Sequence, residues 1–151
     1  PSIKFSSDFI IGYPGETKED FNQTMELMNK VKFINSYSYI FNPRPGTPAF
    51  HMKGIEKDLA KESLFTFQNL SKKIKTEYRK TLFKKTMSVL FENKTKNDNQ
   101  YFGRDEYYNS VIVKSNQDLS GKIKNVKITK VSQNTLFGEV VQKLIHKEFA
   151  A

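Results

Sequence analysis

The sequence predicts an α/β segment followed by a small all-β barrel, and three observations support this division. The first half alternates apolar strand-like runs with amphipathic helical stretches. Turns of Gly and Pro directly follow both predicted strands of that half. After Thr86 the helical spacing stops, and short strand-like runs are separated by polar loops. We place the domain boundary near Leu82, which gives domains of residues 1–81 and 82–146.

The first predicted strand, Ile3 to Ile11, is rich in β-forming residues and nearly continuously apolar at its end. This pattern is typical of a strand that is buried on both faces of a parallel sheet. The turn GYPG ends the strand, and Thr17 with Asp20 three residues later predicts an N-cap with a near capping box. Apolar residues at helical spacing then predict a helix from Lys18 to about Lys32.

A second strand, Ser36 to Phe41, ends at the turn NPRPG. Strand, helix and strand joined by short loops predict a right-handed βαβ unit with parallel strands. A long amphipathic helix is predicted from Glu56 to about Phe83. Its apolar stripe consists of Ala60, Leu64, Phe67, Ile74 and Tyr78, with the small Ser71 between them. Its other face is basic and carries Lys57, Lys61, Lys72, Lys73, Lys75, Arg79 and Lys80. We interpret this face as solvated, with direct RNA contact as the alternative.

The remaining sequence predicts a small antiparallel β-barrel of roughly 60 residues, because its strands leave no room for crossover helices. The predicted strands are Met87 to Glu92, Tyr107 to Lys114, Lys122 to Val131 and Leu136 to Val141. The loops KTKNDNQ and NQDLSG and the turn SQNT separate them.

Composition limits the partners and cofactors of this chain. It has 25 Lys and Arg against 16 Asp and Glu, and the net charge of +9 favours an anionic partner such as nucleic acid or a membrane surface. No run approaches the roughly 20 apolar residues that span a bilayer, and no signal peptide is visible, so we expect a cytoplasmic protein. Without cysteine, the chain cannot by itself bind an iron–sulfur cluster through thiolates. Because a strand begins almost at Pro1, we expect a piece of a longer protein.

Two sets of motifs resemble a known family. DFIIGYPGET and NPRPGTPA, about thirty residues apart, resemble the last strands of the partial (β/α) barrel of radical S-adenosylmethionine (SAM) enzymes, and more narrowly of the methylthiotransferases. VLFE, FGR-x-x-Y, GKIKNVKIT and NTLFGEVV resemble the C-terminal, OB-like TRAM domain of the same family. The resemblance runs from about Phe5 to Val141.

The resemblance implies an enzyme that adds a methylthio group to carbon 2 of isopentenylated adenosine beside the anticodon of tRNA. It implies SAM and two [4Fe-4S] clusters as cofactors, and tRNA as partner. The family binds its clusters through a CxxxCxxC triad and three further cysteines, which this chain lacks. We therefore expect the clusters to lie upstream and the chain alone to be inactive, without a catalytic residue of its own. We expect a monomer that does not bind membranes.

Two alternatives stay open at this point. The chain could belong to a truncated RNA-binding module that retains the TRAM barrel without catalysis. It could also belong to the related methylthiotransferase that acts on threonylcarbamoyladenosine in tRNA.

Four residues are candidates for a cofactor site. Asp8, Ile10 and Gly12 share a parity in the first strand, and the resemblance implies that Ile10 and Gly12 line the SAM site. The alternative is that Gly12 only forms a turn, and that Asp8 pairs with a neighbouring strand. Arg44, between two prolines, is assigned to SAM or the substrate nucleotide, with a structural salt bridge as the alternative. His51 and His146 are isolated, so we predict no metal site.

The RNA-binding candidates lie in the barrel, where basic residues are interleaved with aromatic ones. Lysines on strands commonly mark a solvated face, but this pattern also fits phosphate neutralisation combined with ring stacking. We favour RNA contact because of the resemblance to a TRAM domain. The candidates are Lys84, Lys85, Phe102, Arg104, Tyr107, Tyr108, Lys122, Lys124, Lys127 and Lys130.

Overall fold

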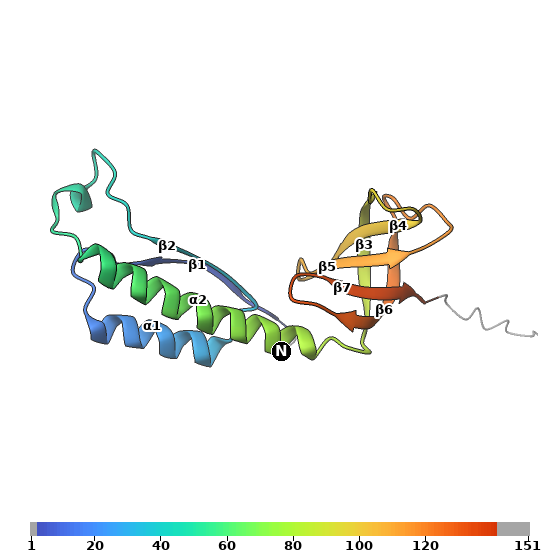
Figure 1. Cartoon of the computed structure of the whole chain (residues 1–151), viewed down its shortest axis with the longest axis horizontal. Coiled ribbons are helices and arrows are strands. Elements are labelled where there is room, and N and C mark those ends of the chain that lie inside the picture. The colour runs from blue at the N-terminus through green and yellow to red at the C-terminus, as the bar shows by residue number, and fades with distance from the viewer. Residues whose placement is uncertain (1–2, 142–151) are drawn as a thin grey trace, which may run out of the picture. The chain divides into compact units, whose positions relative to one another are not determined.

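The computed structural model describes residues 3–141 and divides the chain between Tyr78 and Arg79 into two compact units (Figure 1). The predicted second domain extends to residue 146, so residues 142–146, with His146, lie outside the described part. Each unit is described by itself. No helix in residues 3–141 is long and apolar enough to cross a membrane.

The first unit is built around two parallel strands, as the sequence predicts. β1 (Ser6–Ile11) pairs with β2 (Asn35–Ile40), and α1 (Lys18–Val31) connects them. The predicted capping box is confirmed: Asp20 N donates to Thr17 Oγ1 over 3.1 Å, and Thr17 N donates to Asp20 Oδ2 over 2.8 Å. A loop with the short 3₁₀ helix η1 (Pro48–His51) leads to α2 (Lys57–Lys80).

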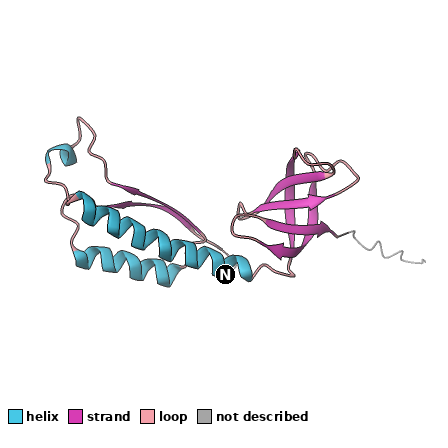
Figure 2. Ribbon diagram, viewed as in Figure 1, coloured by secondary structure: helices cyan, strands magenta, loops and turns pink. Residues whose placement is uncertain are grey.

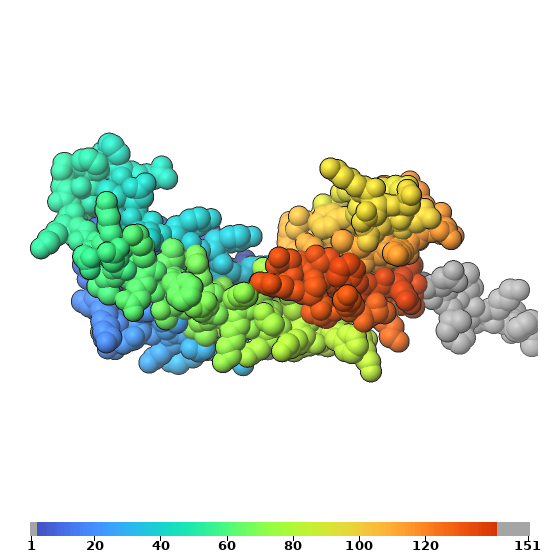
Figure 3. Space-filling view, in the orientation of Figure 1, coloured from blue at the N-terminus to red at the C-terminus, as the bar shows by residue number. Residues whose placement is uncertain are grey.

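Both helices cover the same face of this two-stranded sheet (Figure 1). The core contains Ile11 of β1, Met28 of α1, and Phe67 and Ile74 of α2. On the other face Ile10, Tyr37 and Tyr39 are 59%, 61% and 60% exposed. The prediction that the first strand is buried on both faces is therefore wrong for residues 3–141, in which only one face is covered. Residues 41–56 project away from the sheet as a lobe (Figure 3).

The second unit is a closed five-stranded barrel (Figure 2). Its strands are β3 (Thr86–Lys94), β4 (Gln100–Asp105), β5 (Ser110–Lys114), β6 (Ile123–Val131) and β7 (Leu136–Val140), in the order β3-β4-β5-β7-β6. The barrel differs from its prediction in two ways. β4 was not predicted, and the segment from Tyr107 to Asn109, predicted as strand, lies in the turn that follows it. The barrel is also not wholly antiparallel, since β5 and β7 pair in parallel.

Two matched irregularities bend the barrel strands. β3 has a register shift between Phe91 and Asn93, and Gly103 of β4 lies opposite Phe91. β6 has a shift between Ile128 and Lys130, and Gly138 of β7 lies opposite Ile128. A Cβ at either glycine would lie 2.5 Å from a carbonyl oxygen of the facing strand. Bulges and close backbone approach at glycine are the usual means of curving a small barrel until it closes.

The prediction that Arg79 lies on the solvated basic face of the long helix is wrong. Its side chain is only 5% exposed, and its Nη1 donates to the backbone carbonyl of Gln133 in the turn between β6 and β7. Asp105 and Asn109 of the same unit are also buried, and the rest of its described core is apolar. It includes Leu82, Val89, Phe91, Val111, Val126, Ile128 and Leu136.

Candidate functional site

A pocket lies where β1 and β2 end, because the carboxyl ends of parallel strands meet at one sheet edge. It has a volume of about 570 Å³, which is within the range of small-molecule sites. Phe41 N donates to Ile11 O over 2.8 Å, which extends the strand pairing to the pocket. The ring centroids of Tyr13 and Phe41 are 5.0 Å apart, edge to face. The lining residues are Ile10, Tyr13, Tyr39, Ile40, Phe41, Asn42, Arg44, Thr47 and Ala49.

Arg44 brings the cationic group of this pocket. Its loop is closed by Thr47, whose Oγ1 and backbone N donate to Arg44 O over 2.8 and 3.3 Å. The turn needs a left-handed residue, and Gly46 supplies it with a φ of 84°. Aromatic and aliphatic walls beside one guanidinium suit a ligand that has a flat apolar ring and a carboxylate or phosphate.

The other two cofactor candidates do not line this pocket. Asp8 lies opposite Tyr37 on the exposed face of the sheet. Gly12 follows the end of β1, and a Cβ on it would lie 3.0 Å from the Cβ of Ala60 in α2. The backbone N of Gly12 donates to Glu16 Oε2 over 2.6 Å. The structure thus brings Ile10 and Arg44 together, and it gives Gly12 a packing reason to be glycine.

A second candidate surface lies on the outside of the barrel. Outward residues of neighbouring strands form one register row, in which Phe102 of β4 pairs with Ile112 of β5, Ile112 with Phe137 of β7, and Phe137 with Lys130 of β6. We define the aromatic–cation face as this row together with Arg104 and Tyr108. Lys130 Nζ lies 5.7 Å from the ring centroid of Phe137, so a cation lies over the end of the row.

Arg104 lies close to two of the predicted aromatic residues, Phe102 and Tyr108. Its Cζ lies 5.3 Å from the ring centroid of Phe102 and 6.0 Å from that of Tyr108. Its Nε lies 3.0 Å from Glu92 Oε1 on β3. Two rings and one carboxylate therefore hold the guanidinium, although each contact at such an exposed position is individually weak.

A buried polar turn presents Tyr108. The carboxylate of Asp105 accepts hydrogen bonds from Tyr107 N, Asn109 N and Asn109 Nδ2 over 2.9, 2.8 and 2.8 Å. Asp105 and Asn109 are buried, whereas Tyr108 is 73% exposed and adopts a left-handed φ of 60°. The turn thus rests on a buried support and holds an aromatic ring in solvent.

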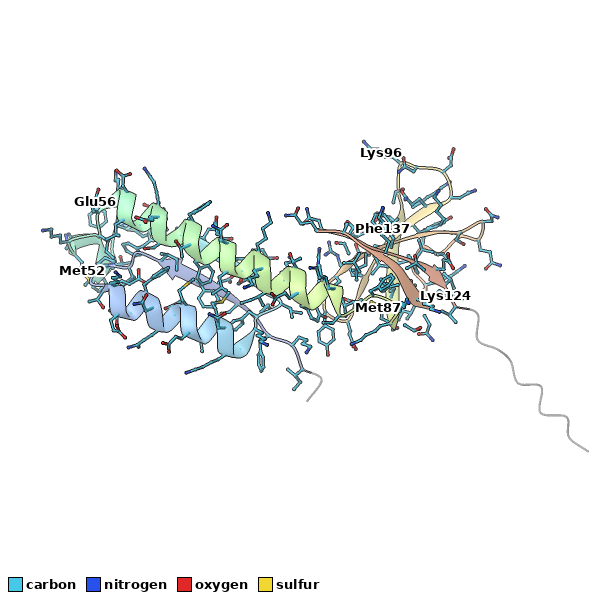
Figure 4. The ribbon with its side chains drawn as sticks, turned by 60° about the horizontal axis from the view of Figure 1, so that its bottom comes forward. Met52, Glu56, Met87, Lys96, Lys124 and Phe137 are labelled. Atoms are coloured by element: carbon cyan, nitrogen blue, oxygen red, sulfur yellow. The ribbon has the colours of Figure 1, made fainter. Side chains whose placement is uncertain are left out.

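The predicted lysines surround the barrel without forming one cluster. Lys84 N donates to Ile128 O and Ile128 N donates to Lys85 O, both over 2.9 Å, so this segment pairs with β6. Lys127 of β6 lies opposite Thr86, beside Lys85 in the chain. Lys124 lies near the start of β6, whereas Phe137 of β7 pairs with Lys130 near the other end of β6 (Figure 4). Lys96 lies in the β3–β4 loop.

Lys122 has a local role in the loop before β6. Its Nζ donates to Asp118 O over 2.7 Å. In the same loop Ser120 N donates to Asp118 Oδ1 over 3.0 Å, and this hydrogen bond lowers the pKa of the Asp118 carboxyl. Lys122 thus stabilises a tight loop as well as adding charge.

Sequence reasoning missed Ile112, Phe137 and Glu92 of this surface. The alternation of strand residues was an available signal for the first two, because Val111 and Leu136 point inward and their neighbours must point outward. No local signal marks Glu92, which meets Arg104 only through the β3–β4 pairing. Within residues 3–141, no group of three or more His, Cys, Asp or Glu could hold a metal ion.

Comparison with known protein families identifies the second unit. The TRAM domain family matches residues 81–141, which include all five barrel strands. The chain therefore contains a TRAM domain. All ten RNA-binding candidates, and the whole aromatic–cation face, lie within this TRAM domain.

Curated relatives extend the match to both units. A protein of Pelagibacter ubique (strain HTCC1062), named tRNA-2-methylthio-N(6)-dimethylallyladenosine synthase, is 46% identical over 142 residues, or 94% of this chain and 32% of the relative. Proteins of the same name from Wolbachia pipientis subsp. Culex pipiens (strain wPip) and Rickettsia conorii (strain ATCC VR-613 / Malish 7) are 43% and 41% identical. They match 91% and 93% of this chain, and 32% of their own length in each case.

The resemblance to the methylthiotransferases is confirmed by these relatives. The chain is homologous to their C-terminal part and spans about a third of their length. The match is not restricted to the TRAM domain, because it covers nearly all of the first unit as well.

Proposed function

We propose that this chain is the C-terminal portion of a tRNA methylthiotransferase that modifies isopentenylated adenosine next to the anticodon. The observation that carries the proposal is the 46% identity to a synthase of that modification over 94% of the chain, across both units. The names of the relatives favour this reaction over the one on threonylcarbamoyladenosine. Such an enzyme works on tRNA in the cytoplasm, and we propose that it does so as a monomer.

In this proposal the first unit is the end of a partial (β/α) radical SAM barrel. Ile10 and Arg44 contribute one wall of the SAM or nucleotide pocket. Ile10 offers an apolar contact for a purine, and the guanidinium of Arg44 can bind a carboxylate or phosphate through two hydrogen bonds. Asp8 and Gly12 belong to the same strand and its turn, and they support that wall. SAM supplies the radical and the methyl group in this family. Cysteines outside this chain hold both [4Fe-4S] clusters, since the chain has none.

The second unit, residues 82–146 in the proposed division, holds the tRNA. Its exposed lysines neutralise phosphates, which gives affinity without reading sequence. The aromatic side chains near Arg104 add contacts to bases or sugars. The membrane-surface alternative for the positive charge is less well supported, because the relatives are named for a tRNA modification.

Nucleoside mass spectrometry tests the proposal. A strain that lacks the full-length gene should lose the 2-methylthio derivative of isopentenyladenosine from its tRNA and accumulate isopentenyladenosine. Reintroducing the full-length gene should restore the derivative, whereas a gene without the codons for the TRAM domain should restore much less of it. Unchanged methylthio levels in the deletion strain would support the RNA-binding module without catalysis, and loss of only the methylthio derivative of threonylcarbamoyladenosine would support the sister enzyme.

A further inference from the structure

We propose that Tyr108, backed by Arg104 and Phe102, stacks on one unpaired base of an RNA loop. The inference rests on the proposed function, which assigns tRNA contact to the barrel. It adds a defined contact and a preference for unpaired over paired RNA, because lysine–phosphate contacts alone do not distinguish the two.

The backbone at Tyr108 supports a functional role for its ring. A bulky residue rarely adopts a left-handed φ, and the value of 60° at Tyr108 is maintained by the buried hydrogen bonds of Asp105. Gly, Asn or Asp would adopt this conformation at lower cost. The position instead carries a large ring that is 73% exposed, so folding gains little from it.

The neighbouring side chains form a platform for a flat ligand. The guanidinium of Arg104 lies within 6.0 Å of the ring centroids of both Phe102 and Tyr108. From Phe102 the apolar row continues through Ile112 to Phe137, where Lys130 provides the second cation. Rings and flat cations stack on any nucleobase, and the lysine can meet the phosphate that follows it.

Glu92 favours a base over a phosphate at this point. Its Oε1 lies 3.0 Å from Arg104 Nε, so a phosphate placed against Arg104 would also meet the charge of this carboxylate. A neutral base face avoids that repulsion. In a duplex the base faces are covered by their stacked neighbours, whereas in a loop a base can turn out and stack on a protein ring. The occupant is therefore an unpaired nucleotide.

The test compares two RNAs and three variants of the 151-residue chain by fluorescence anisotropy. The RNAs are a hairpin with an unpaired loop and a fully paired duplex with the same number of phosphates. Tyr108→Asn keeps a residue that accepts the left-handed turn but removes the ring. Tyr108→Phe keeps the ring, and Tyr37→Ala removes a similarly exposed tyrosine from the other unit.

We expect the parent to bind the hairpin more tightly than the duplex. Tyr108→Asn should weaken hairpin binding by about 5- to 100-fold and leave duplex binding unchanged. Tyr108→Phe and Tyr37→Ala should behave like the parent, and circular dichroism should show the same fold for all four proteins.

Two results would overturn the proposal in distinguishable ways. If the parent binds both RNAs and Tyr108→Asn weakens neither, or weakens both equally, the stacking contact is wrong while the RNA-binding role stands. If the parent binds neither RNA at low ionic strength, the role of the barrel in the proposed function fails as well, and the face would be a candidate for a protein partner.

Discussion

Asp105 holds the turn that presents Tyr108 on the aromatic–cation face. It is a buried carboxylate that accepts three hydrogen bonds, two of them from the backbone amides of Tyr107 and Asn109 in the turn. A buried group of this kind is tolerated only when its hydrogen bonds are formed. Tyr108 and Asn109 depend on it for their positions.

We expect Asp105→Ala to lower the free energy of unfolding of the barrel by about 1–3 kcal/mol, because it leaves buried donors without an acceptor. Urea unfolding followed by tyrosine fluorescence measures the effect. Asp98→Ala, at an exposed position of the β3–β4 loop, is the control and should change little. Equal stability of Asp105→Ala and the parent would show that the turn does not need this carboxylate.

The capping box of α1 predicts an acid-sensitive helix end. Hydrogen bonds from the Thr17 hydroxyl and then from the Thr17 backbone N–H lower the pKa of Asp20 below its ordinary value of 3.8. The folded state then binds fewer protons than the unfolded chain, so this stabilisation is present above pH 3.8 and is lost as the pH falls below it. Helicity measured by circular dichroism should decrease in that range.

Two variants isolate this contribution. Asp20→Asn should remove the part of the acid transition that belongs to the cap, and Thr17→Ser should keep it, because serine retains the hydroxyl. An acid transition that is identical in Asp20→Asn and the parent would contradict the assignment.

Among the candidate site residues, some could be singled out from the sequence because residue type and close neighbours mark them, and their roles stay predictions. Arg44 between prolines and the aromatic residues around Arg104 could be singled out before the structure. The sequence contained no indication of contacts with elements that are distant in the chain. Gly12 lies against Ala60, 48 positions away, and Glu92 meets Arg104 through strand pairing. Such long-range contacts leave no periodic signal in a single sequence.

At the scale of elements, the barrel depends on the two positions where a bulge faces a glycine. A Cβ on Gly103 would lie 2.8 Å from Val89 Cγ1, and one on Gly138 would lie 2.5 Å from Val126 Cγ1. Both valines are fully buried, so they have no room to move aside.

We expect Gly103→Ala and Gly138→Ala each to destabilise the barrel by about 1–3 kcal/mol through overpacking. The midpoint of urea unfolding measures the loss. Gly54→Ala is the matched control, because a Cβ there meets no atom within 4 Å. If either barrel variant matched the parent in stability, the glycine would not be required for closure.

The local sequence predicts elements better than it predicts their partners. The βαβ unit and the capping box follow from spacing and are observed. β4 was overlooked because it directly follows an Asn-rich loop and its sequence QYFGRD combines Gly103 with polar residues, so it resembles turn sequence. The parallel pairing of β5 with β7 depends on how the chain connects the strands around the barrel, and the sequence of either strand alone does not indicate it.

At the scale of the whole molecule, the two units differ in whether their β-sheet closes. The barrel closes on itself and leaves no unpaired edge. The first unit has a two-stranded sheet whose Ile10, Tyr37 and Tyr39 face solvent. An open sheet of two strands is marginal by itself, so the units should differ in stability.

Limited proteolysis should therefore leave a resistant core that begins near Arg79 and includes β3 to β7. Mass spectrometry of the surviving fragment gives its ends, and the fragment expressed alone should give a β-type circular dichroism spectrum with a cooperative thermal transition. Preferential survival of the unit before Arg79 would contradict this order of stability.

If the barrel holds tRNA through its exposed lysines, the binding affinity must depend strongly on salt concentration. The parent chain should bind an anticodon stem-loop with an affinity that falls steeply as ionic strength rises. Lys85→Ala combined with Lys127→Ala should weaken binding and reduce the slope by roughly one unit per lost contact. Lys72→Ala with Lys73→Ala removes the same charge from α2 and should leave the slope unchanged. If the barrel variant binds like the parent at low and moderate salt while the α2 variant loses affinity, the RNA-holding surface is the helix and not the barrel.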